Sequence, residues 1–367
     1  MSRAPGLMKF SMLTAEMPKC WRGAIPHAVE CSDDASLRLE HVTLFASNCF
    51  GFLEVNCDGT VYVGCRIDRR PPEDDPVKRA SARLRSPDAD ACHSKHAIKG
   101  SSYLECSARF MGDDCINICG DYHMVMALQG RSLRVLAKGQ MNIQPGDPVE
   151  LVLYSGERLP DAVAVAVEPS GSIRDDEKAF LARQALDANL KSARGLGNAF
   201  TITRDREVAM VRGGILCSAR RVGNNFAVRN CNFGFNRSRG ILIKASHGEI
   251  TGNHLEGCRM SAILVAPEYW WLEAGSSTDL DHADMAYEWL FNGINSSSGL
   301  RGAGPLPAQR IEVSGQLKAL FPAHLNSLGL RKADGTALTL DANGDGPFKD
   351  YVKSFVIAAA QRALKGR

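Results

Sequence analysis

The sequence has no long hydrophobic run and almost no net charge. No window approaches the roughly 18 apolar residues needed to span a membrane, and residues 1–20 contain no apolar core of signal-peptide length. The 44 Lys and Arg residues nearly balance the 41 Asp and Glu residues, which leaves a formal net charge of +3. This balance argues against a nucleic-acid partner reached through bulk electrostatics. We therefore expect neither a membrane span nor a nucleic-acid partner, and the composition leaves the cellular location open.

The chain is longer than one typical domain, with 367 residues that include 34 Gly and 12 Cys. Frequent Gly, together with Asn beside short apolar runs, favours many short strands joined by tight corners over a helical bundle. A disulfide scaffold would suit only a small exported chain. Most of the cysteines occupy strand-like positions, and we interpret these as small buried hydrophobic residues: Cys49, Cys57, Cys65, Cys92, Cys106, Cys115, Cys231 and Cys258.

Apolar residues recur with a spacing of 22 residues. A period of this length suits one coil of a right-handed parallel β-helix, in which three short strands and three corners stack on the next coil through main-chain hydrogen bonds. An ordinary sandwich would also contain many turns but gives no reason for a constant register. We therefore predict an all-β fold, a right-handed parallel β-helix. The matched pairs are Val228 with Ile250, Phe233 with Leu255, Ile241 with Ile263, and Leu39 with Val61.

The repeat is interrupted once and fades near its end. After the first interruption the sequence shows alternating β segments, a PGDPV turn and helical spacing over 174–193, without the coil period. Toward the end of the chain, amphipathic patterns over 282–294 and 348–367 predict helices. The predicted organisation is N-terminal coils over 1–123, an inserted small β-rich domain over 124–208, C-terminal coils over 209–280, and a mixed, helical C-terminal segment over 281–367.

Three aspartates fall at related positions of two consecutive coils. Asp90 lies 23 residues before Asp113, and Cys92 lies 23 residues before Cys115, so the two segments align as neighbours stacked about 5 Å apart. Asp114 follows directly, and a corner or bulge is needed to turn both acids of the pair outward. The spacing therefore predicts that all three carboxyl groups lie together on one face.

Clustered carboxylates of this kind can carry acid–base chemistry. Like charges a few ångströms apart repel, so at least one carboxyl group keeps its proton near neutral pH. A protonated acid beside an ionised carboxylate is what glycoside hydrolysis requires: one group protonates the leaving oxygen and the other activates water. An aspartate-rich corner or a calcium site remains the alternative interpretation.

Four segments together resemble a known family: ADACHSKHAIKG (89–100), FMGDDCINICGDY (110–122), RGILIKA (239–245) and ILVAPEYWWLE (263–273). They are similar to the pectin-lyase-like β-helix proteins, and more closely to the bacterial exo-alpha-1,3-galactosidases that remove terminal galactose from branched glycans. The resemblance covers roughly residues 37–275. Its most specific element is GDD-x-IN with an aspartate one coil upstream. Polygalacturonases share the arrangement of one Asp a coil ahead of a DD pair.

The resemblance implies an inverting glycoside hydrolase, an alpha-galactosidase-like enzyme with no cofactor or metal, exported or periplasmic. Asp113 would be the general acid, while Asp90 and Asp114 would hold and deprotonate the water; either member of the adjacent pair could be the acid. Relatives usually have His-Gly where this chain has Cys119 followed by Gly, and loss of a tuning or sugar-binding His would put activity in question.

Several other residues are candidates for sugar contacts. His93 and His96 follow Asp90 and could bond a sugar hydroxyl or an aspartate; a metal site with the acids is the alternative. Arg239 and Lys244 are spaced more loosely than the Arg-x-Lys with which polygalacturonases hold a uronate, which favours a neutral sugar. The candidate substrate-binding residues are His93, His96, Arg239, Lys244, Glu268, Trp270, Trp271 and Glu273.

The aromatic run PEYWWLEAG (267–275) suits a platform for the apolar face of a sugar, flanked by Glu268 and Glu273 for its hydroxyl groups. Core packing is the alternative, and we expect at least one of Trp270 and Trp271 to be buried. DANGDG (341–346) matches the first half of a calcium loop, but its twelfth position is Val352, so no EF-hand is predicted.

The prediction is therefore a hydrolase of terminal alpha-galactosides or another neutral glycan, with an oligosaccharide or polysaccharide as partner. A polysaccharide lyase on the same fold is one alternative; it would need a basic residue to abstract a proton, and calcium. A non-catalytic β-helix that binds glycans is the other.

Overall fold

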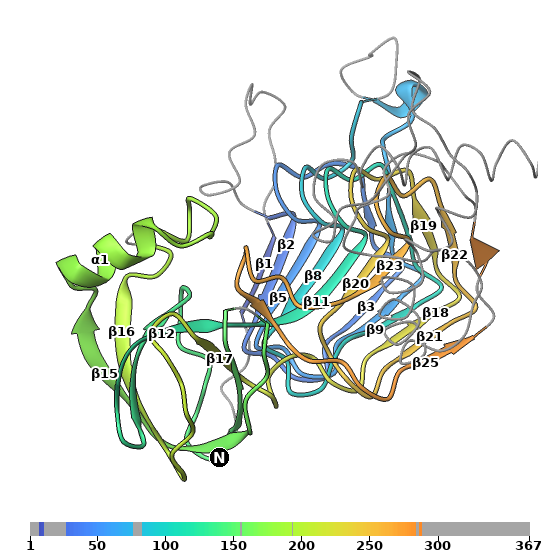
Figure 1. Ribbon diagram of the computed structural model, residues 1–367. Helices are drawn as coiled ribbons and strands as arrows, with labels where there is room; N and C mark the ends of the chain where they lie inside the picture. The colour runs from blue at the N-terminus through green and yellow to red at the C-terminus, as the bar shows by residue number, and fades with distance from the viewer. Residues whose placement is uncertain are drawn as a thin grey trace, which may run out of the picture.

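The computed structural model describes residues 7–10, 27–75, 83–154, 156–192, 194–283 and 286–287 (Figure 1). Within these ranges the chain is almost entirely strand, with one α-helix, α1 (Asp175–Ala182), and one 3-10 turn, η1 (Pro72–Asp74). The all-β prediction is confirmed. Among the described residues, no helix combines the length and the apolar character that crossing a membrane requires.

Three largely parallel sheets make up most of the described chain. The first contains β1 (Leu7–Phe10), β2 (Val29–Ser32), β5 (Phe52–Val55), β8 (Cys92–Lys95), β11 (Ile116–Asp121), β20 (Ile241–Ile243) and β23 (Ile263–Val265), with β24 (Glu273–Ala274) attached to β11. The second contains β3 (Arg38–Glu40), β6 (Val61–Val63), β9 (Ser102–Leu104), β18 (Ala227–Arg229), β21 (Glu249–Thr251) and β25 (Asp281–Ala283). The third contains β4 (Thr43–Leu44), β7 (Arg66–Ile67), β10 (Ser107–Arg109), β19 (Asn232–Gly234), β22 (His254–Glu256) and β26 (Ala286–Tyr287).

The chain visits the three sheets in turn, so each pass adds one strand to each sheet and forms one layer. Within a sheet, consecutive layers pair in parallel, as strands β2, β5, β8, β11 and β20 show in Figure 1. The exception in the first sheet is β1, which pairs antiparallel with β2. Alternate side chains point into the space between the sheets, where apolar residues from every layer form one core. The eight cysteines assigned to the interior are all buried, as predicted.

The 22-residue period gives the correct register in the later layers only. Val228 pairs with Ile250, and the other two matches from that region are likewise confirmed. The predicted pairing of Leu39 with Val61 is wrong by one residue, since Leu39 pairs with Tyr62. The 23-residue alignment around the aspartates is also wrong by one, since Cys92 lies opposite Ile116. The corners between strands differ in length from layer to layer, so the spacing varies.

A closed antiparallel barrel interrupts the layers after β11 (Figure 1). It runs from His123 to Ser218, somewhat beyond the 124–208 expected for the insertion, because the segment read as the resumed coil pairs with barrel strands. In the described part of the helical pattern, residues 174–192, only α1 is an α-helix. The barrel strands are β12 (His123–Gln129), β13 (Ser132–Ala137), β14 (Pro148–Val152), β15 (Ala162–Ser172), β16 (Asn198–Arg204) and β17 (Ile215–Ser218).

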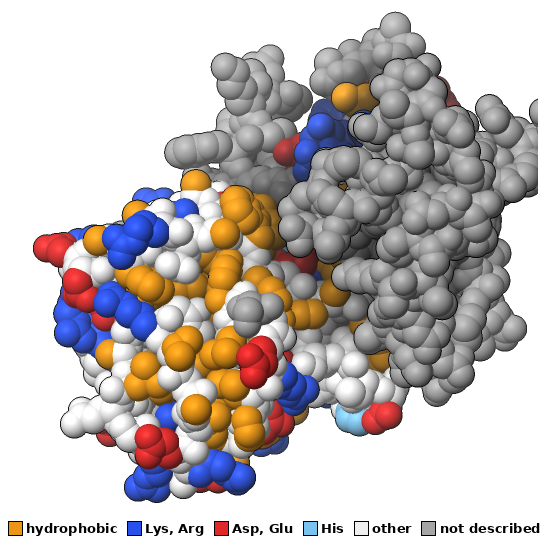
Figure 2. Space-filling view, in the orientation of Figure 1, with side chains coloured by type: hydrophobic (Ala, Val, Ile, Leu, Met, Phe, Trp, Pro, Cys, Tyr) orange, Lys and Arg blue, Asp and Glu red, His pale blue; other side chains and the backbone are white. Residues whose placement is uncertain are grey.

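The strands that follow the barrel pair directly with the strands that precede it. β18, β19 and β20 stack directly on β9, β10 and β11, so Ile241 lies opposite Ile116 in the first sheet. This stacking brings the RGILIKA segment beside the segment that carries the paired aspartates. The outer surface of the barrel carries clusters of hydrophobic side chains with charged residues between them (Figure 2), and Val165 is among its exposed hydrophobic residues.

The layers also extend past residue 280. The helix predicted over 282–294 is wrong at its start, where β25 and β26 add a strand to the second and third sheets. The edge strands of the second and third sheets have unpaired backbone N–H and C=O groups, and strands β25 and β26 form hydrogen bonds with them. The helical pattern of the side chains does not reflect this pairing. The predicted helix over 348–367 and the DANGDG segment lie outside the described residues.

Candidate functional site

The candidate site lies on the outer face of the first sheet, around β8 and β11. Ile116 and Ile118 point into the core, so the alternating residues Asn117 and Cys119 point outward. These outward side chains are nevertheless buried. The segment after β23 turns back through a bridge between Glu268 and Glu273, and β24 pairs antiparallel with β11. This return segment covers the outward face and places two carboxylates over it.

The three predicted aspartates come together at the start of β8 and β11. One carboxyl oxygen from each of Asp90, Asp113 and Asp114 lies within 4.8 Å of the others. The amide of Asp114 donates a hydrogen bond to Oδ1 of Asp90 (3.1 Å). Asp90 and Asp114 are buried, whereas the side chain of Asp113 is 21% exposed. Asp113 is therefore the member of the trio that a ligand reaches from solvent.

Close contact between layers fixes the corner that carries the pair. The amide of Gly112 donates to the carbonyl of Pro87 (2.9 Å), and a Cβ at Gly112 would lie 2.2 Å from the carbonyl oxygen of Asp88. Asn236 donates from Nδ2 to the carbonyl of Asp113 (2.8 Å). Hydrogen bonds to the backbone from both neighbouring layers thus set the position of the two acids.

Burial and mutual repulsion keep protons on this cluster. Burial raises the pKa of Asp90 well above its ordinary value, and the charges of Asp113 and Glu273 raise it further. Burial also raises the pKa of Asp114, helped by Asp90 and opposed by Arg239. Arg239 donates to Asp114 from its backbone N–H (2.7 Å) and from Nη2 (2.9 Å). The raised pKa values of Asp90 and Asp114 therefore favour retention of a proton on the buried part of the cluster.

Arg239 and Lys244 belong to a chain of ion pairs beneath the return segment. Arg239 Nη2 lies 3.1 Å from Glu268 Oε2, and Lys244 Nζ lies 3.2 Å from the same oxygen. Lys244 is fully buried, and its Nζ also donates to Glu273 Oε2 (2.9 Å) and to Asn117 Oδ1 (3.1 Å). Burial alone would raise the pKa of Glu273, but Lys244 and Lys138 hold it well below its ordinary value. Arg239 and Lys244 are thus both paired with carboxylates of the protein itself.

His93 connects the aspartates to the thiol of Cys119. Its Nδ1 shares a 2.6 Å hydrogen bond with Asp90 Oδ2, and its Nε2 lies 3.8 Å from Cys119 Sγ. Phe50 packs against the ring, with centroids 4.7 Å apart. Burial lowers the pKa of His93 to about 3, so the imidazole is neutral at physiological pH.

His96 belongs to a separate polar cluster at the junction with the barrel. Its Nε2 shares a 2.7 Å hydrogen bond with Asp121 Oδ2, while Lys138 Nζ and Lys95 Nζ lie 2.7 and 3.2 Å from Oδ1. Burial alone would raise the pKa of Asp121, but the two lysines and His96 hold it well below its ordinary value. Because Lys138 directly follows the barrel strand β13, this cluster ties the barrel to the first sheet.

The tryptophans of the return segment are not buried. Trp270 is 51% exposed and Trp271 39%, so the expectation that at least one is buried is wrong. The turn is instead anchored by Leu272, which is fully buried, and by Tyr269, whose ring centroid lies 5.8 Å from that of Tyr122, between β11 and the first barrel strand. The anchoring residues leave both indole rings accessible.

Two site residues, Asn117 and Lys138, escaped the sequence analysis, and a third, Cys119, was noted there only as a departure from the family pattern. Asn117 forms hydrogen bonds with both Lys244 and Glu273. Lys138 forms an ion pair with Asp121. The sulfur of Cys119 lies beside the imidazole of His93. Asn117 lies inside the GDD-x-IN element, but nothing in the sequence signals that the return segment would cover it. Lys138 lies in the barrel, and no periodic pattern relates it to the layers.

The whole chain matches no family model, and a search of curated proteins gives no match.

Proposed function

We propose that this protein is a glycoside hydrolase that removes a terminal alpha-linked galactose, or another neutral sugar, from a glycan, and that its three sheets form a right-handed parallel β-helix. The main support is the trio of Asp90, Asp113 and Asp114, whose oxygens lie within 4.8 Å of one another. Two members are buried and protonated more readily than usual, and the third is accessible. Glycoside hydrolysis needs a protonated carboxyl group close to a second carboxyl group that acts as base, and the raised pKa values favour a proton on the buried pair.

In the proposed mechanism Asp113 meets the glycosidic oxygen. It is the accessible carboxyl group, so it delivers the proton to the leaving group, and the cluster's shared proton supplies it. Asp90 and Asp114 hold the water and accept its proton as it attacks the sugar. Arg239, bonded to Asp114, favours the ionised form that a base needs. Asp114 is the alternative acid.

The distance between the carboxyl groups bears on the stereochemical outcome. Inverting enzymes usually separate their two carboxyl groups by about 6.5–9.5 Å, and retaining enzymes by about 5–5.5 Å. The oxygens of the trio lie within 4.8 Å, which is close to the retaining range. Inversion, which the family resemblance implies, therefore requires the water to sit beside the trio and not between its members. The first anomer released distinguishes the two schemes.

A neutral sugar fits the charges of the site. A uronate would need a cation to pair with its carboxylate, but Arg239 and Lys244 are already paired with Asp114, Glu268 and Glu273. Trp270 and Trp271 are accessible, and we assign them to the apolar face of a sugar unit. Lys244 is fully buried, so its proposed role is to position Glu268 and Glu273 and not to contact the substrate.

A screen of nitrophenyl glycosides tests the proposal. We expect release of nitrophenol from an alpha-galactoside or another neutral alpha-glycoside without added calcium. Products with an absorbing double bond and calcium-dependent turnover would indicate the lyase. Sugar binding that survives Asp113→Asn, with no turnover by the wild-type protein, would indicate the non-catalytic glycan-binding protein.

A further inference from the structure

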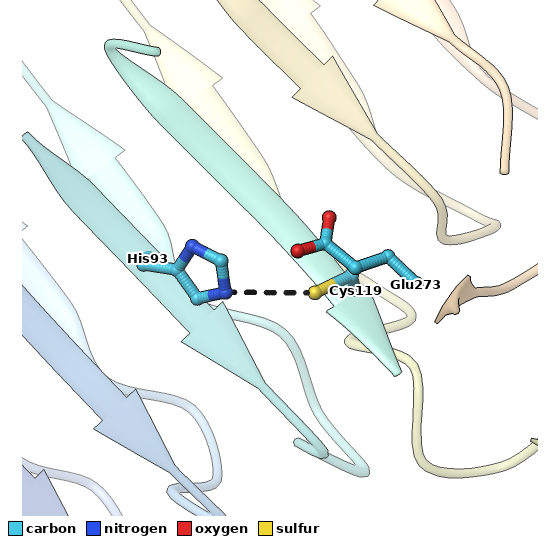
Figure 3. Close-up of side chains that lie close together, drawn as sticks. All are labelled: His93, Cys119 and Glu273. Carbon is cyan, nitrogen blue, oxygen red and sulfur yellow. Dashed lines mark hydrogen bonds between the residues drawn. The ribbon is translucent and has the colours of Figure 1, made fainter. Parts of the chain in front are cut away.

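Beside the aspartate trio, three side chains with different donor atoms converge (Figure 3). They are Cys119 on β11, His93 on β8 and Glu273 on β24, and one donor atom from each lies within 4.8 Å of the others. Cys119 and His93 are buried, and the side chain of Glu273 is 13% exposed. The sulfur, nitrogen and oxygen donors come from three separate strands, so the fold and not local sequence assembles them.

This donor set matches the ligands of zinc. Zn²⁺ binds thiolate at about 2.3 Å, imidazole nitrogen at about 2.0–2.1 Å and carboxylate oxygen at about 2.0–2.2 Å in tetrahedral geometry. A sulfur and a nitrogen bound in this way lie about 3.5 Å apart, and the observed separation of Cys119 Sγ and His93 Nε2 is 3.8 Å. A thiolate ligand disfavours magnesium and calcium, which prefer oxygen.

The neighbouring residues already orient the donors. Zinc-binding histidines usually bond a carboxylate through their second ring nitrogen, and His93 bonds Asp90 in this way, with Nε2 turned toward Cys119. Lys244 and Asn117 both donate to Oε2 of Glu273, which fixes the carboxylate and leaves Oε1 for an ion. Little rearrangement is therefore needed for all three donors to reach one metal.

We propose that Cys119, His93 and Glu273 bind one Zn²⁺ ion, or a similar borderline-soft divalent metal, with a fourth position open to water or a ligand. Binding replaces the thiol proton of Cys119, which is released to solvent. Asp90 positions His93 without touching the metal. This proposal does not depend on the glycosidase function, and it differs from the expectation that the protein binds no metal.

Cobalt titration of the full chain tests the site. The protein, freed of metal and of any affinity tag, is titrated with Co²⁺ and then with Zn²⁺ as competitor. We expect one Co²⁺ per chain, a near-ultraviolet thiolate-to-cobalt absorption band, and loss of the band as Zn²⁺ displaces Co²⁺. Cys119→Ser should abolish the band and weaken binding at least tenfold, while Asp90→Asn should weaken binding about 10- to 100-fold.

Cys57→Ser is the matched control, because Cys57 is equally buried but belongs to the core between the sheets. It should leave the band unchanged. X-ray absorption of the zinc-loaded wild-type protein adds a test that needs no variant, and one sulfur in the first coordination shell is expected. No binding, a band that persists in Cys119→Ser, or zero or several sulfurs would overturn the proposal.

Discussion

Asp114 donates its backbone N–H to the carboxylate of Asp90 across 3.1 Å, although the two residues are 24 positions apart in the chain. The bond joins two consecutive layers of the first sheet at the point where both acids leave the corner. It couples the protonation of the aspartates to the stacking of the layers. The stability of the protein should therefore depend on pH in a way that identifies these residues.

Replacing Asp90 with Asn should stabilise the protein increasingly as pH rises. The folded-state pKa of Asp90 is raised above the unfolded value of about 3.9, so the folded protein binds the proton more tightly. Stability conferred by Asp90 is present below pH 4 and is lost as pH rises toward the folded-state pKa, by up to about 1.4 kcal/mol per pH unit. Urea unfolding between pH 4 and pH 7 measures this. A stability difference between variant and wild type that is independent of pH would contradict the prediction.

Asp121→Asn should show the opposite trend. The folded-state pKa of Asp121 is held below the unfolded value by Lys138, Lys95 and His96 against the effect of burial. Its stabilisation is therefore present above about pH 4 and is lost as pH falls toward the folded-state pKa. We expect the variant to lose about 3–5 kcal/mol of unfolding free energy at pH 7, because two lysines lose their partner. Urea unfolding extended from pH 7 down to pH 3 should show this loss shrinking below pH 4; an undiminished loss at pH 3 would contradict the prediction.

Removing the buried cation Lys244 should be strongly destabilising. Lys244→Met keeps the hydrophobic stem but leaves Glu268 and Glu273 without their shared partner. A loss of about 3–5 kcal/mol in the free energy of unfolding is expected. The control is Arg229→Ala, which breaks an exposed pair with Glu249 and should change stability by about 1 kcal/mol or less. Equal losses of unfolding free energy in the two variants would mean that the buried ion pairs of Lys244 do not stabilise the protein more than an exposed pair does.

The sequence predicted the strand pattern because buried side chains recur at every layer. Val228 and Ile250 occupy equivalent interior positions, so the period between them reports a real contact. The period failed for Leu39 and for the aspartate segments because corners of variable length add one or two residues. The aspartates still came together, because the observed 24-residue offset brings Asp114, the second acid of the adjacent pair, into line with Asp90.

The rest of the site could not be read from periodicity. Glu273 reaches Lys244 because the return segment folds back and pairs antiparallel with β11. No pattern in the local sequence predicts this tertiary contact. Asp121 and Lys138 meet only because the barrel docks against the first sheet. Cys119 drew notice in the sequence as a departure from a family pattern, and only the fold places its sulfur beside His93.

Time-resolved proton NMR of wild-type protein and Asp113→Asn with a nitrophenyl alpha-galactoside tests the central claim most directly. Asp161→Asn, on the barrel and paired with Arg158, is the control. We predict that the wild type and the control release galactose first as the inverted anomer, and that Asp113→Asn lowers kcat/KM by about 10²–10⁴. Turnover that is unaffected by Asp113→Asn, or a wild-type protein inert toward every neutral glycoside tested, would contradict the account.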